Sequence, residues 1–411
     1  LLTYFYLFLL VYTAIPNRFI QDNLNLCTFR NAILGSIKSL NLEQVIILSR
    51  HNVRTPLSKY LHEITPKQWP KWKEKSGYLT EKGFKLEGFM GEYFSLWFKK
   101  EGLIADCPTE DDFFAYANTK QRTMASAKAF VSKCFPSCDI KIHHSNTTVD
   151  PIFNPVLHNN SVIFRDLVIE QMTEQLKHIN LNFSYDFLEN ILEYKHSSFC
   201  IKEQKCNLKT DINKIIDIKQ GFKPNLSGPL KISNSAVDAF IMENYEDFEQ
   251  TAWGNLSTKD QWFAIMKLSR AFHNVIFNTT LVATDIAKPL IKYISNICHE
   301  RYPKITLLMG HDANMYTVMK AMKFKPYGLK KQYEVTPVGG KIMFEKWKDE
   351  KNNRYLLRIH YVYQSTDQLR NGIELNLHNP PQFQILELSD CPLIKEGYCL
   401  WDDFVKLLKN L

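Results

Sequence analysis

The segment that determines the fold is Gln44-Val45-Ile46-Ile47-Leu48-Ser49-Arg50-His51-Asn52-Val53-Arg54-Thr55-Pro56. Residues 45–48 are apolar and mostly β-branched without polar alternation, which is typical of a strand buried on both faces of a parallel sheet. Charged residues begin where this strand should end, and the proline prevents further regular pairing. Because ligands of open α/β sheets bind outside the carboxyl ends of the strands, Arg50, His51 and Arg54 are predicted to form part of a functional site.

These three basic side chains suit a site that binds a phosphate dianion and also holds a nucleophile. Arginine guanidinium groups match phosphate oxygens bidentately and stay charged at any working pH. Two cations beside His51 should lower its pKa, which keeps the imidazole neutral and nucleophilic in mildly acidic solution. The alternative is a basic surface loop, and Arg-His-x-x-Arg alone fits that equally well. The preceding strand and the following proline favour the functional interpretation.

Two motifs resemble those of a known enzyme family. Residues 50–56 resemble the Arg-His-Gly-x-Arg-x-Pro signature of the histidine acid phosphatases, and Gly310-His311-Asp312-Ala313-Asn314 resembles their distal His-Asp element. Asn52 departs from the usual glycine, and the bacterial glucose-1-phosphatase branch of the family shares this departure. The chain resembles that branch from about residue 42 to its C-terminus. Further points of likeness are residues 150–155, 227–231 and 336–342.

The resemblance implies an α/β fold with a mostly parallel central sheet flanked by helices, into which a smaller α-helical domain is inserted. The chain of 411 residues is long enough for two domains or one large α/β enzyme. Its 45% hydrophobic and 23% charged residues argue against a disordered or fibrous protein.

The net charge of +8 suits an anionic partner. However, the sequence has no basic run with interleaved aromatic residues, no zinc-ligand spacing and no Gly-rich phosphate loop, so a nucleic-acid partner is not expected. A diffuse positive field that attracts small phosphate esters explains the charge.

The N-terminal segment is predicted to be a truncated signal peptide that covers residues 1–16. Residues 1–14 form an apolar run of suitable length without an initiator Met. A span of the bilayer needs ~20 apolar residues, so a membrane anchor or a core helix is the less favoured alternative. We expect the mature enzyme to begin between Pro16 and Cys27 and to have no stable membrane anchor.

Cysteine usage favours an oxidising compartment. The nine cysteines lie at positions 27, 107, 134, 138, 200, 206, 298, 391 and 399. Two close pairs are typical of disulfides that close surface loops: Cys200/Cys206 and Cys391/Cys399. A metal site is disfavoured because no Cys-x-x-Cys pair exists. The family resemblance implies a third bridge, Cys107/Cys138. Cys27, Cys134 and Cys298 are then left without an assigned partner. Because this number is odd, at least one thiol must be free or form an intermolecular disulfide.

Six Asn-x-Ser/Thr sequons fit a secreted eukaryotic glycoprotein, although several could arise by chance in an Asn-rich chain. They begin at Asn146, Asn159, Asn182, Asn225, Asn255 and Asn278. Together with the apolar start and the cysteine pairs, they predict a secreted or periplasmic protein.

A second strand and helix are predicted to bring another arginine to the site. Thr80 is a plausible N-cap of a helix that ends at Gly102, and residues 112–117 form a strand followed by a helix through Phe130. Arg122 would then lie in a first helical turn, where free N–H groups also favour an anion. A lone arginine here could be a solvated helix start, but its Gln-Arg-Thr context resembles the family pattern and implies substrate binding.

Residues 161–288 show amphipathic helical stretches broken by glycine and proline. By resemblance, this block is the inserted helical lid, and the α/β phosphatase domain comprises residues 28–160 and 289–411. Asp238 in the lid is predicted to contact a sugar hydroxyl of the substrate. The scattered histidines are expected to be hydrogen-bonded or exposed and not metal ligands: His158, His178, His196 and His273.

Residues 305–309 form another continuous apolar strand, which should deliver Gly310, His311 and Asp312 to the sheet edge that carries His51. A His-Asp step also occurs in metal hydrolases, but no second acidic or histidine cluster accompanies it. We therefore expect neither a metal nor another cofactor.

The family resemblance implies a two-step phosphoryl transfer in which His51 attacks phosphorus and Asp312 acts as general acid and then as base. Four side chains would hold the phosphoryl oxygens: Arg50, Arg54, Arg122 and His311. The expected substrate is a small phosphomonoester such as glucose 1-phosphate. Asn52 and the likeness to the glucose-1-phosphatase branch favour it, and so do Leu57 and Ser58 after the signature proline, where phytases of the family often have polar and basic residues.

Three alternatives remain open at this point. The first is a phytase-like inositol polyphosphate phosphatase, and the second is a secreted, non-catalytic binding protein of the same fold. The third is a phosphate mutase. The apolar start and the cysteine pairs disfavour it, because mutases act on cytosolic metabolites. The sequence leaves the oligomeric state open.

Overall fold

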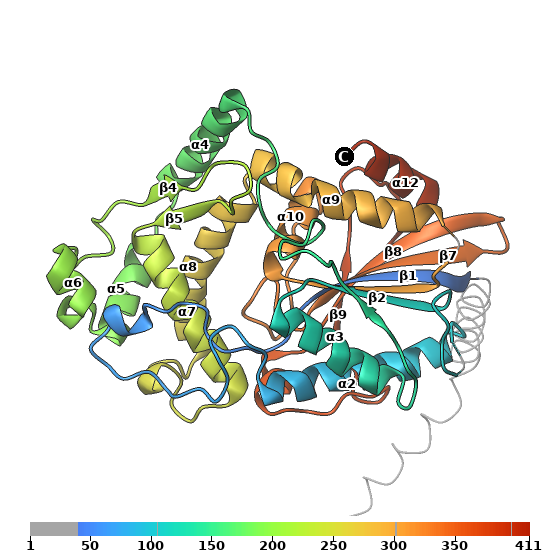
Figure 1. Ribbon diagram of the computed structural model, residues 1–411, viewed down its shortest axis with the longest axis horizontal. Helices are drawn as coiled ribbons and strands as arrows, with labels where there is room; N and C mark the ends of the chain where they lie inside the picture. Colours follow the sequence, from blue (N-terminus) through green and yellow to red (C-terminus); the bar gives the residue numbers. More distant parts are fainter. Residues whose placement is uncertain (1–39, 105, 301, 396) are drawn as a thin grey trace, which may run out of the picture.

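The computed structural model describes residues 40–104, 106–300, 302–395 and 397–411. The predicted signal peptide and Cys27 lie outside the described residues. The described chain comprises a part built on a large sheet and a mainly helical part beside it (Figure 1).

Nine strands of the described chain form the sheet that carries the site. They are β1 (Leu40–Arg50), β2 (Phe113–Ala117), β3 (Ile142–His143), β6 (Ile305–Gly310), β7 (Lys341–Asp349), β8 (Arg354–Tyr363), β9 (Gln382–Leu386), β10 (Leu393–Lys395) and β11 (Tyr398–Leu400). Their order is β10-β11-β8-β7-β1-β6-β2-β3, with β9 paired to β8. The pairs β1/β6, β6/β2 and β2/β3 are parallel. The remaining pairs of this sheet are antiparallel. Since β8 and β10 run in the direction of these four strands, most of the sheet points one way, and the predicted α/β class is confirmed.

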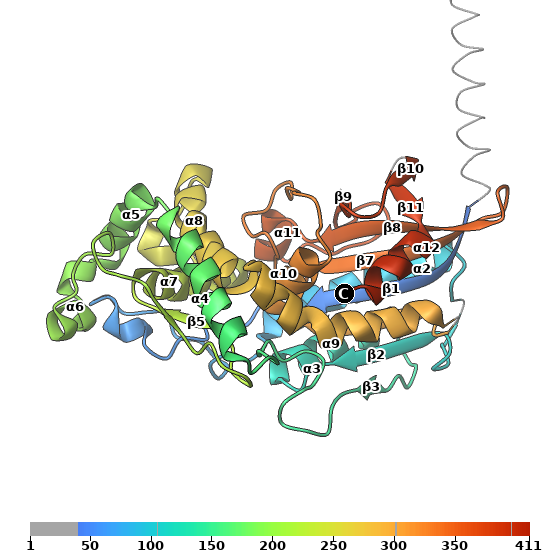
Figure 2. The same cartoon turned by 90° about the horizontal axis from the view of Figure 1, so that it is seen from above.

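Strand β1 is buried on both faces, as its apolar run predicts. Val45 and Ile47 lie in one hydrophobic cluster, whereas Ile46 and Leu48 lie in another. Helices α2 (Glu81–Lys100) and α3 (Gln121–Cys134) cover one face of the sheet. Helices α9 (Thr280–His299), α10 (Asp312–Ala321) and α12 (Trp401–Lys409) cover the opposite face (Figures 1 and 2). The first cluster draws on α2 and α3 and the second on α9, α10 and α12, so the strand is held between two helical layers.

Local signals position the ends of these elements. Thr80 caps α2, as predicted, because its hydroxyl oxygen accepts a 2.9 Å hydrogen bond from the backbone N–H of Gly83. Strands β1 and β6 are aligned so that Arg50 lies beside Gly310, and the N–H of His51 donates to the Gly310 carbonyl at 3.0 Å. The two predicted motifs therefore leave the sheet side by side.

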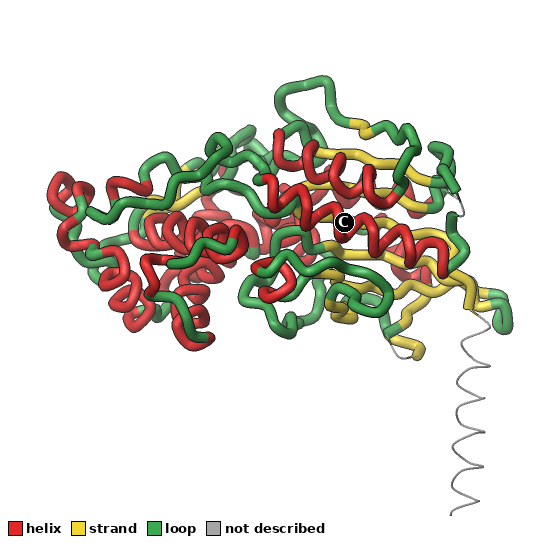
Figure 3. Tube along the Cα trace, turned by 90° about the horizontal axis from the view of Figure 1, so that it is seen from below, coloured by secondary structure: helices red, strands yellow, loops and turns green. Residues whose placement is uncertain are grey.

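The second part consists mainly of helices, with loops and one short two-stranded sheet (Figure 3). Its elements are α4 (Val162–Lys177), α5 (Asn182–Leu192), α6 (Ser198–Glu203), β4 (Lys214–Ile216), β5 (Asn225–Ser227), α7 (Pro229–Glu246) and α8 (Lys259–Phe277). Shorter helices are η1 (Leu61–Glu63), η2 (Tyr194–His196), η3 (Thr251–Gly254) and α11 (Thr366–Arg370). The predicted domain bounds stay a prediction, and the boundary at 288–289 falls inside the continuous helix α9.

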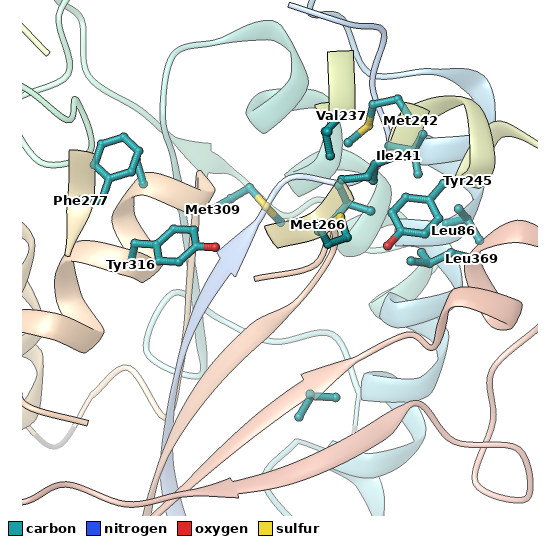
Figure 4. Close-up of a cluster of buried hydrophobic side chains, with 14 of the residues drawn as sticks. Leu86, Val237, Ile241, Met242, Tyr245, Met266, Phe277, Met309, Tyr316 and Leu369 are labelled. Carbon is teal, nitrogen blue, oxygen red and sulfur yellow. The ribbon is translucent and has the colours of Figure 1, made fainter. Parts of the chain in front are cut away.

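A shared hydrophobic cluster joins the two parts (Figure 4). Ile241 of α7 and Met266 of α8 belong to the same cluster as Met309 of β6 and Tyr316 of α10. Because protein interiors are close-packed, this contact fixes α7 and α8 against the strand ends where the site lies.

The described residues contain three disulfides, and they are the three predicted pairs: Cys107–Cys138, Cys200–Cys206 and Cys391–Cys399. Cys134 and Cys298 are buried, and neither forms a disulfide within the described part of the chain. Disulfides persist in oxidising compartments, so the bridges are consistent with an extracytoplasmic protein. Within the described part of the chain, no helix has both the length and the apolar character that crossing a membrane requires.

Candidate active site

Two strand ends and two helix starts bring the predicted residues together. Arg50 is the last residue of β1, and His311 is the N-cap of α10 directly after β6. The rings of His51 and His311 lie 5.5 Å apart, inclined by 71°. Arg122, in the first turn of α3, places its guanidinium 3.3 Å from Nδ1 of His311. The convergence of these side chains at one sheet edge agrees with the sequence-based expectation.

The imidazole of His51 is held with one nitrogen free. Its Nδ1 lies 2.8 Å from the carbonyl oxygen of Asn52, which can only accept, so Nδ1 carries the proton and Nε2 keeps its lone pair. Burial, followed by the charges of Arg122 and Arg50, lowers the pKa of His51 well below its usual value. The ring is therefore neutral in acid solution, with Nε2 available for attack.

Arg50 is a buried cation held between two carboxylates. One terminal nitrogen donates to Glu334 Oε1 at 2.7 Å and to the carbonyl oxygen of Thr336, and the other lies 3.5 Å from Asp312 Oδ2. Burial opposes the charge, but Glu334 and Asp312 raise the pKa of Arg50 above its usual value. The guanidinium is therefore charged at every pH at which the enzyme would work.

Arg54 is oriented by Asp238 of α7. The guanidinium donates two hydrogen bonds to the carboxylate, of 3.0 and 2.7 Å, in the bidentate arrangement typical of strong pairs. Burial raises the pKa of Asp238, but Arg54 more than offsets this, and the net shift is downward. The structure thus brings Asp238 into the site as the partner of Arg54, and its predicted contact with a sugar hydroxyl stays a prediction.

Asn118, after β2, fixes the tautomer of His311. Its Oδ1 accepts from the N–H of Lys120 at 3.1 Å and lies 3.2 Å from His311 Nε2, so Nε2 must donate and Nδ1 accepts from Arg122. Burial and Arg122 lower the pKa of His311 well below its usual value. Burial and Arg54 lower the pKa of Arg122 to about 10, which leaves it charged in acid solution. His311 can thus offer an N–H to an anion only by turning from Asn118.

Asp312 is the first residue of α10, and its side chain is 25% exposed. Its Oδ2 lies 3.5 Å from Arg50 and 4.0 Å from Nε2 of His273 in α8. Burial alone would raise the pKa of Asp312, but the positive charges of Arg50, His273 and Lys223 lower it well below its usual value. The carboxylate is therefore ionised when no substrate is bound.

A buried ion pair supports the loop that carries His51. Asn52 Nδ2 donates to Glu87 Oε2 at 2.9 Å, and Lys341 Nζ donates to Glu87 Oε1 at 2.6 Å. The side chains of Glu87 and Lys341 are completely buried. Gly339 has φ +66°, and a Cβ there would lie 2.4 Å from Asn52 Nδ2. The amide at Asn52 therefore fits because residue 339 is glycine and because Glu87 accepts its hydrogen bond.

Replacement of Lys341 by methionine should leave the Glu87 carboxylate buried without its cation. Removal of one partner of a buried pair typically costs about 3–5 kcal/mol. We expect urea unfolding of Lys341→Met to show a loss of this size. The double variant Lys341→Met/Glu87→Gln should recover part of the stability, because no charge then remains buried. A single variant that is as stable as the double variant would contradict this account.

Several residues of the site carry no local sequence signal. Glu334, Asn118, His273 and Lys223 reach the site from distant parts of the chain, and His273 and Lys223 act on Asp312 by their charge. An isolated charged or amide residue in a loop or helix does not indicate its partner. A buried arginine such as Arg50 does predict that an acidic partner should exist, because a buried charge must be paired.

Comparison with known proteins places this geometry in a family. The model of the histidine phosphatase superfamily, branch 2, matches residues 41–362. A glucose-1-phosphatase of Providencia rettgeri is 42% identical over 380 residues, which cover 89% of this chain and 91% of the relative. The phytase AppA of Escherichia coli is 26% identical over 93% of this chain and 95% of its own length. The solved structure of Hafnia alvei phytase superposes with a TM-score of 0.83 at 28% identity, covering 90% of this chain and 97% of that one.

The chain therefore belongs to branch 2 of the histidine phosphatase superfamily. The predicted enzyme class, a histidine acid phosphatase, is confirmed with it.

Proposed function

We propose that the protein hydrolyses small sugar phosphates such as glucose 1-phosphate through a phosphohistidine on His51. The observation that carries this proposal is the free Nε2 of a neutral His51 between the buried charges of Arg50 and Arg122. Relatives named glucose-1-phosphatase, 42% identical over about 90% of this chain, support the substrate class. Release of phosphate from glucose 1-phosphate by the purified protein in acid solution tests it.

In the first step, Nε2 of His51 attacks phosphorus in line with the leaving oxygen. The guanidinium groups of Arg50, Arg54 and Arg122 bind the equatorial oxygens and stabilise the charge that spreads over them. His311 donates its Nε2–H to the phosphoryl group when it turns from Asn118. Asp312, protonated when the substrate is bound, gives its proton to the leaving alcohol.

In the second step, a water molecule attacks the phosphorus of the phosphohistidine. Asp312, now ionised, accepts the proton of this water, and the bond between phosphorus and His51 breaks. Inorganic phosphate then leaves, with Asp312 protonated again and His51 neutral. Buried cations supply the charge stabilisation throughout.

A cavity beside the site has room for the leaving group. Its volume is about 520 Å³, within the range of small-molecule sites, about 300–1,000 Å³. Arg270, Glu334 and Val335 line both this cavity and the pocket that contains Asp312. A hexose on the leaving side of the phosphate could therefore extend toward it.

The variant Asp312→Asn should separate substrates by their leaving groups. A sugar alkoxide needs a proton as it leaves, and general acid catalysis contributes about 10²–10⁴-fold, whereas p-nitrophenolate scarcely needs one. We expect kcat for glucose 1-phosphate to fall by this factor and kcat for p-nitrophenyl phosphate to fall much less. Equal losses on the two esters in steady-state assays would remove Asp312 from the role of general acid.

The proposed location is secreted or periplasmic, with the signal peptide removed. The three disulfides support an oxidising compartment. Three of the predicted sequon asparagines, Asn146, Asn159 and Asn182, are exposed and thus open to a glycosyltransferase. N-terminal sequencing and glycosidase treatment of the protein from its natural source test this location.

A further inference from the structure

His273 is a mostly buried histidine that the two-step mechanism above does not use. It lies on α8 in the helical part, and its side chain is 16% exposed. Its Nε2 is 4.0 Å from Oδ2 of Asp312, which belongs to α10 on the opposite side of the site. Catalytic hydrogen bonds are often long in empty sites and shorten when substrate binds. The two side chains are therefore within reach of a shared proton.

The orientation of the His273 ring is fixed on two sides. Nδ1 lies 2.8 Å from the carbonyl oxygen of Ser269, so Nδ1 carries a proton and Nε2 is the nitrogen that can gain or lose one. The ring stacks on Tyr316 at 5.1 Å with an angle of 9°. Phe277 lies beside Tyr316 in the same ring cluster (Figure 4). These contacts keep Nε2 directed at Asp312.

The charges that face His273 come from three other elements. Asp312 on α10 raises the pKa of His273, Lys223 on the loop before β5 and Arg50 on β1 lower it, and burial, the largest influence, makes the net shift downward. Tyr316 contributes its ring and is un-ionised, since its pKa is raised by burial. Asp312 itself is ionised when no substrate is bound, because the same positive charges lower its pKa. The residue assigned as general acid thus needs a neighbour from which to obtain a proton.

We propose that His273 and Asp312 hold one proton between them. His273 is then a positioning residue, which supplies this proton to Asp312, the general acid. The inference rests on the proposed function. Before substrate binds, the proton resides on Nε2 of His273. A bound phosphate dianion offsets the charge of Arg50, and the proton then moves from Nε2 to Oδ2 of Asp312.

The proton is conserved over both chemical steps. As the bond between phosphorus and the leaving oxygen breaks, that oxygen takes the proton from Oδ2 of Asp312. As water attacks the phosphohistidine and the P–N bond breaks, one proton of the water passes to Asp312. Release of phosphate restores the positive field around Asp312, and the proton returns to Nε2 of His273.

The sign of the expected pH effect separates this role from a simple electrostatic one. The imidazolium lowers the pKa of Asp312, so removal of His273 as a mere charged neighbour would raise that pKa and extend activity to higher pH. If the pair shares a proton, the variant must rely on Asp312 alone, whose pKa is lower than that of the pair. The basic limb of the pH profile then moves to lower pH.

The experiment uses His273→Phe, which keeps the ring stack on Tyr316, and His273→Gln, which keeps a hydrogen-bonding group that cannot titrate. For both variants, we expect kcat/KM for glucose 1-phosphate to fall about 10–100-fold near the pH optimum of the wild type. This loss is a part of the rate enhancement that general acid catalysis provides. The basic limb should move down by at least about one pH unit. Activity on p-nitrophenyl phosphate should stay within about threefold, since its leaving group needs no proton.

Two controls make the outcome decisive. His299→Gln removes a histidine with the same Nδ1 contact to a helical carbonyl, that of Ser295 at 2.6 Å, and should leave both profiles unchanged. His273→Phe in an Asp312→Asn background should cost nothing more on glucose 1-phosphate. Equal losses on both esters, an upward shift of the basic limb, or full rescue by glutamine would overturn the proposal. Failure of the wild type to hydrolyse either ester would instead overturn the proposed function.

Discussion

The variant His51→Ala is expected to lose at least about 10⁴-fold in kcat on every phosphate ester, because it lacks the imidazole that forms the covalent intermediate. The loss should be as large for p-nitrophenyl phosphate as for glucose 1-phosphate, since both esters need the nucleophile. Arg50, Arg54 and Arg122 remain in the variant, so inorganic phosphate should still bind within about one order of magnitude of the wild-type Kd. Steady-state kinetics and calorimetric titration with inorganic phosphate measure the two quantities.

A matched control is His62→Ala, which removes a histidine whose side chain is 74% exposed and should leave the kinetics unchanged. An acid-labile, alkali-stable phosphoprotein should accumulate when the wild type is quenched during turnover, and it should be absent from His51→Ala. Substantial residual turnover in the variant would remove His51 from the role of nucleophile.

The parts of the fold that could be predicted from sequence are those whose signal is local. The apolar run before Arg50 and the one before Gly310 define two buried strands, and parallel strands must present their carboxyl ends at one edge. Thr80 marks a helix start by its own hydrogen bond. The antiparallel half of the sheet has no such marker, because the pairing of β7 with β1 depends on contacts between segments about 300 residues apart.

The same division holds within the site. Arg50, His51 and Arg54 are adjacent in the sequence, so their joint role is visible in one motif. The residues that orient the side chains of the site come from distant parts of the sequence. Glu334 contacts Arg50, Asp238 contacts Arg54, and Asn118 contacts His311. The sequence predicts that His273 is hydrogen-bonded or exposed. It is hydrogen-bonded, but only the three-dimensional structure brings its second nitrogen to Asp312.

At Leu57 the border of the site is apolar. Leu57 directly follows the signature proline, and its side chain is 48% exposed. A Cβ on Gly77 would lie 3.0 Å from Leu57 Cδ2 and 3.8 Å from a terminal nitrogen of Arg122, so Gly77 is close to both the leucine and the phosphate-binding arginine. Leu57 therefore borders the approach to the site, and it offers no charge to a second phosphate.

We accordingly expect kcat/KM for glucose 1-phosphate to exceed that for phytate. Each additional phosphate of phytate must lose water, and a phosphate left without a partner carries the penalty that produces discrimination on the order of ~10⁴ when buried polar groups stay unpaired. Comparison of kcat/KM for the two substrates in acid solution measures the ratio. A higher value for phytate would overturn the substrate proposal and leave the mechanism intact.

The substitution Leu57→Lys probes the physical cause of this preference. A lysine at this border should raise kcat/KM for phytate by about tenfold, the effect of about 1.4 kcal/mol of added phosphate contact, and should change kcat/KM for glucose 1-phosphate little. The matched control, Leu96→Lys, adds the same charge at a leucine of α2 that is 41% exposed. If both lysines raise phytate turnover equally, the preference arises from net charge and not from the apolar border at Leu57.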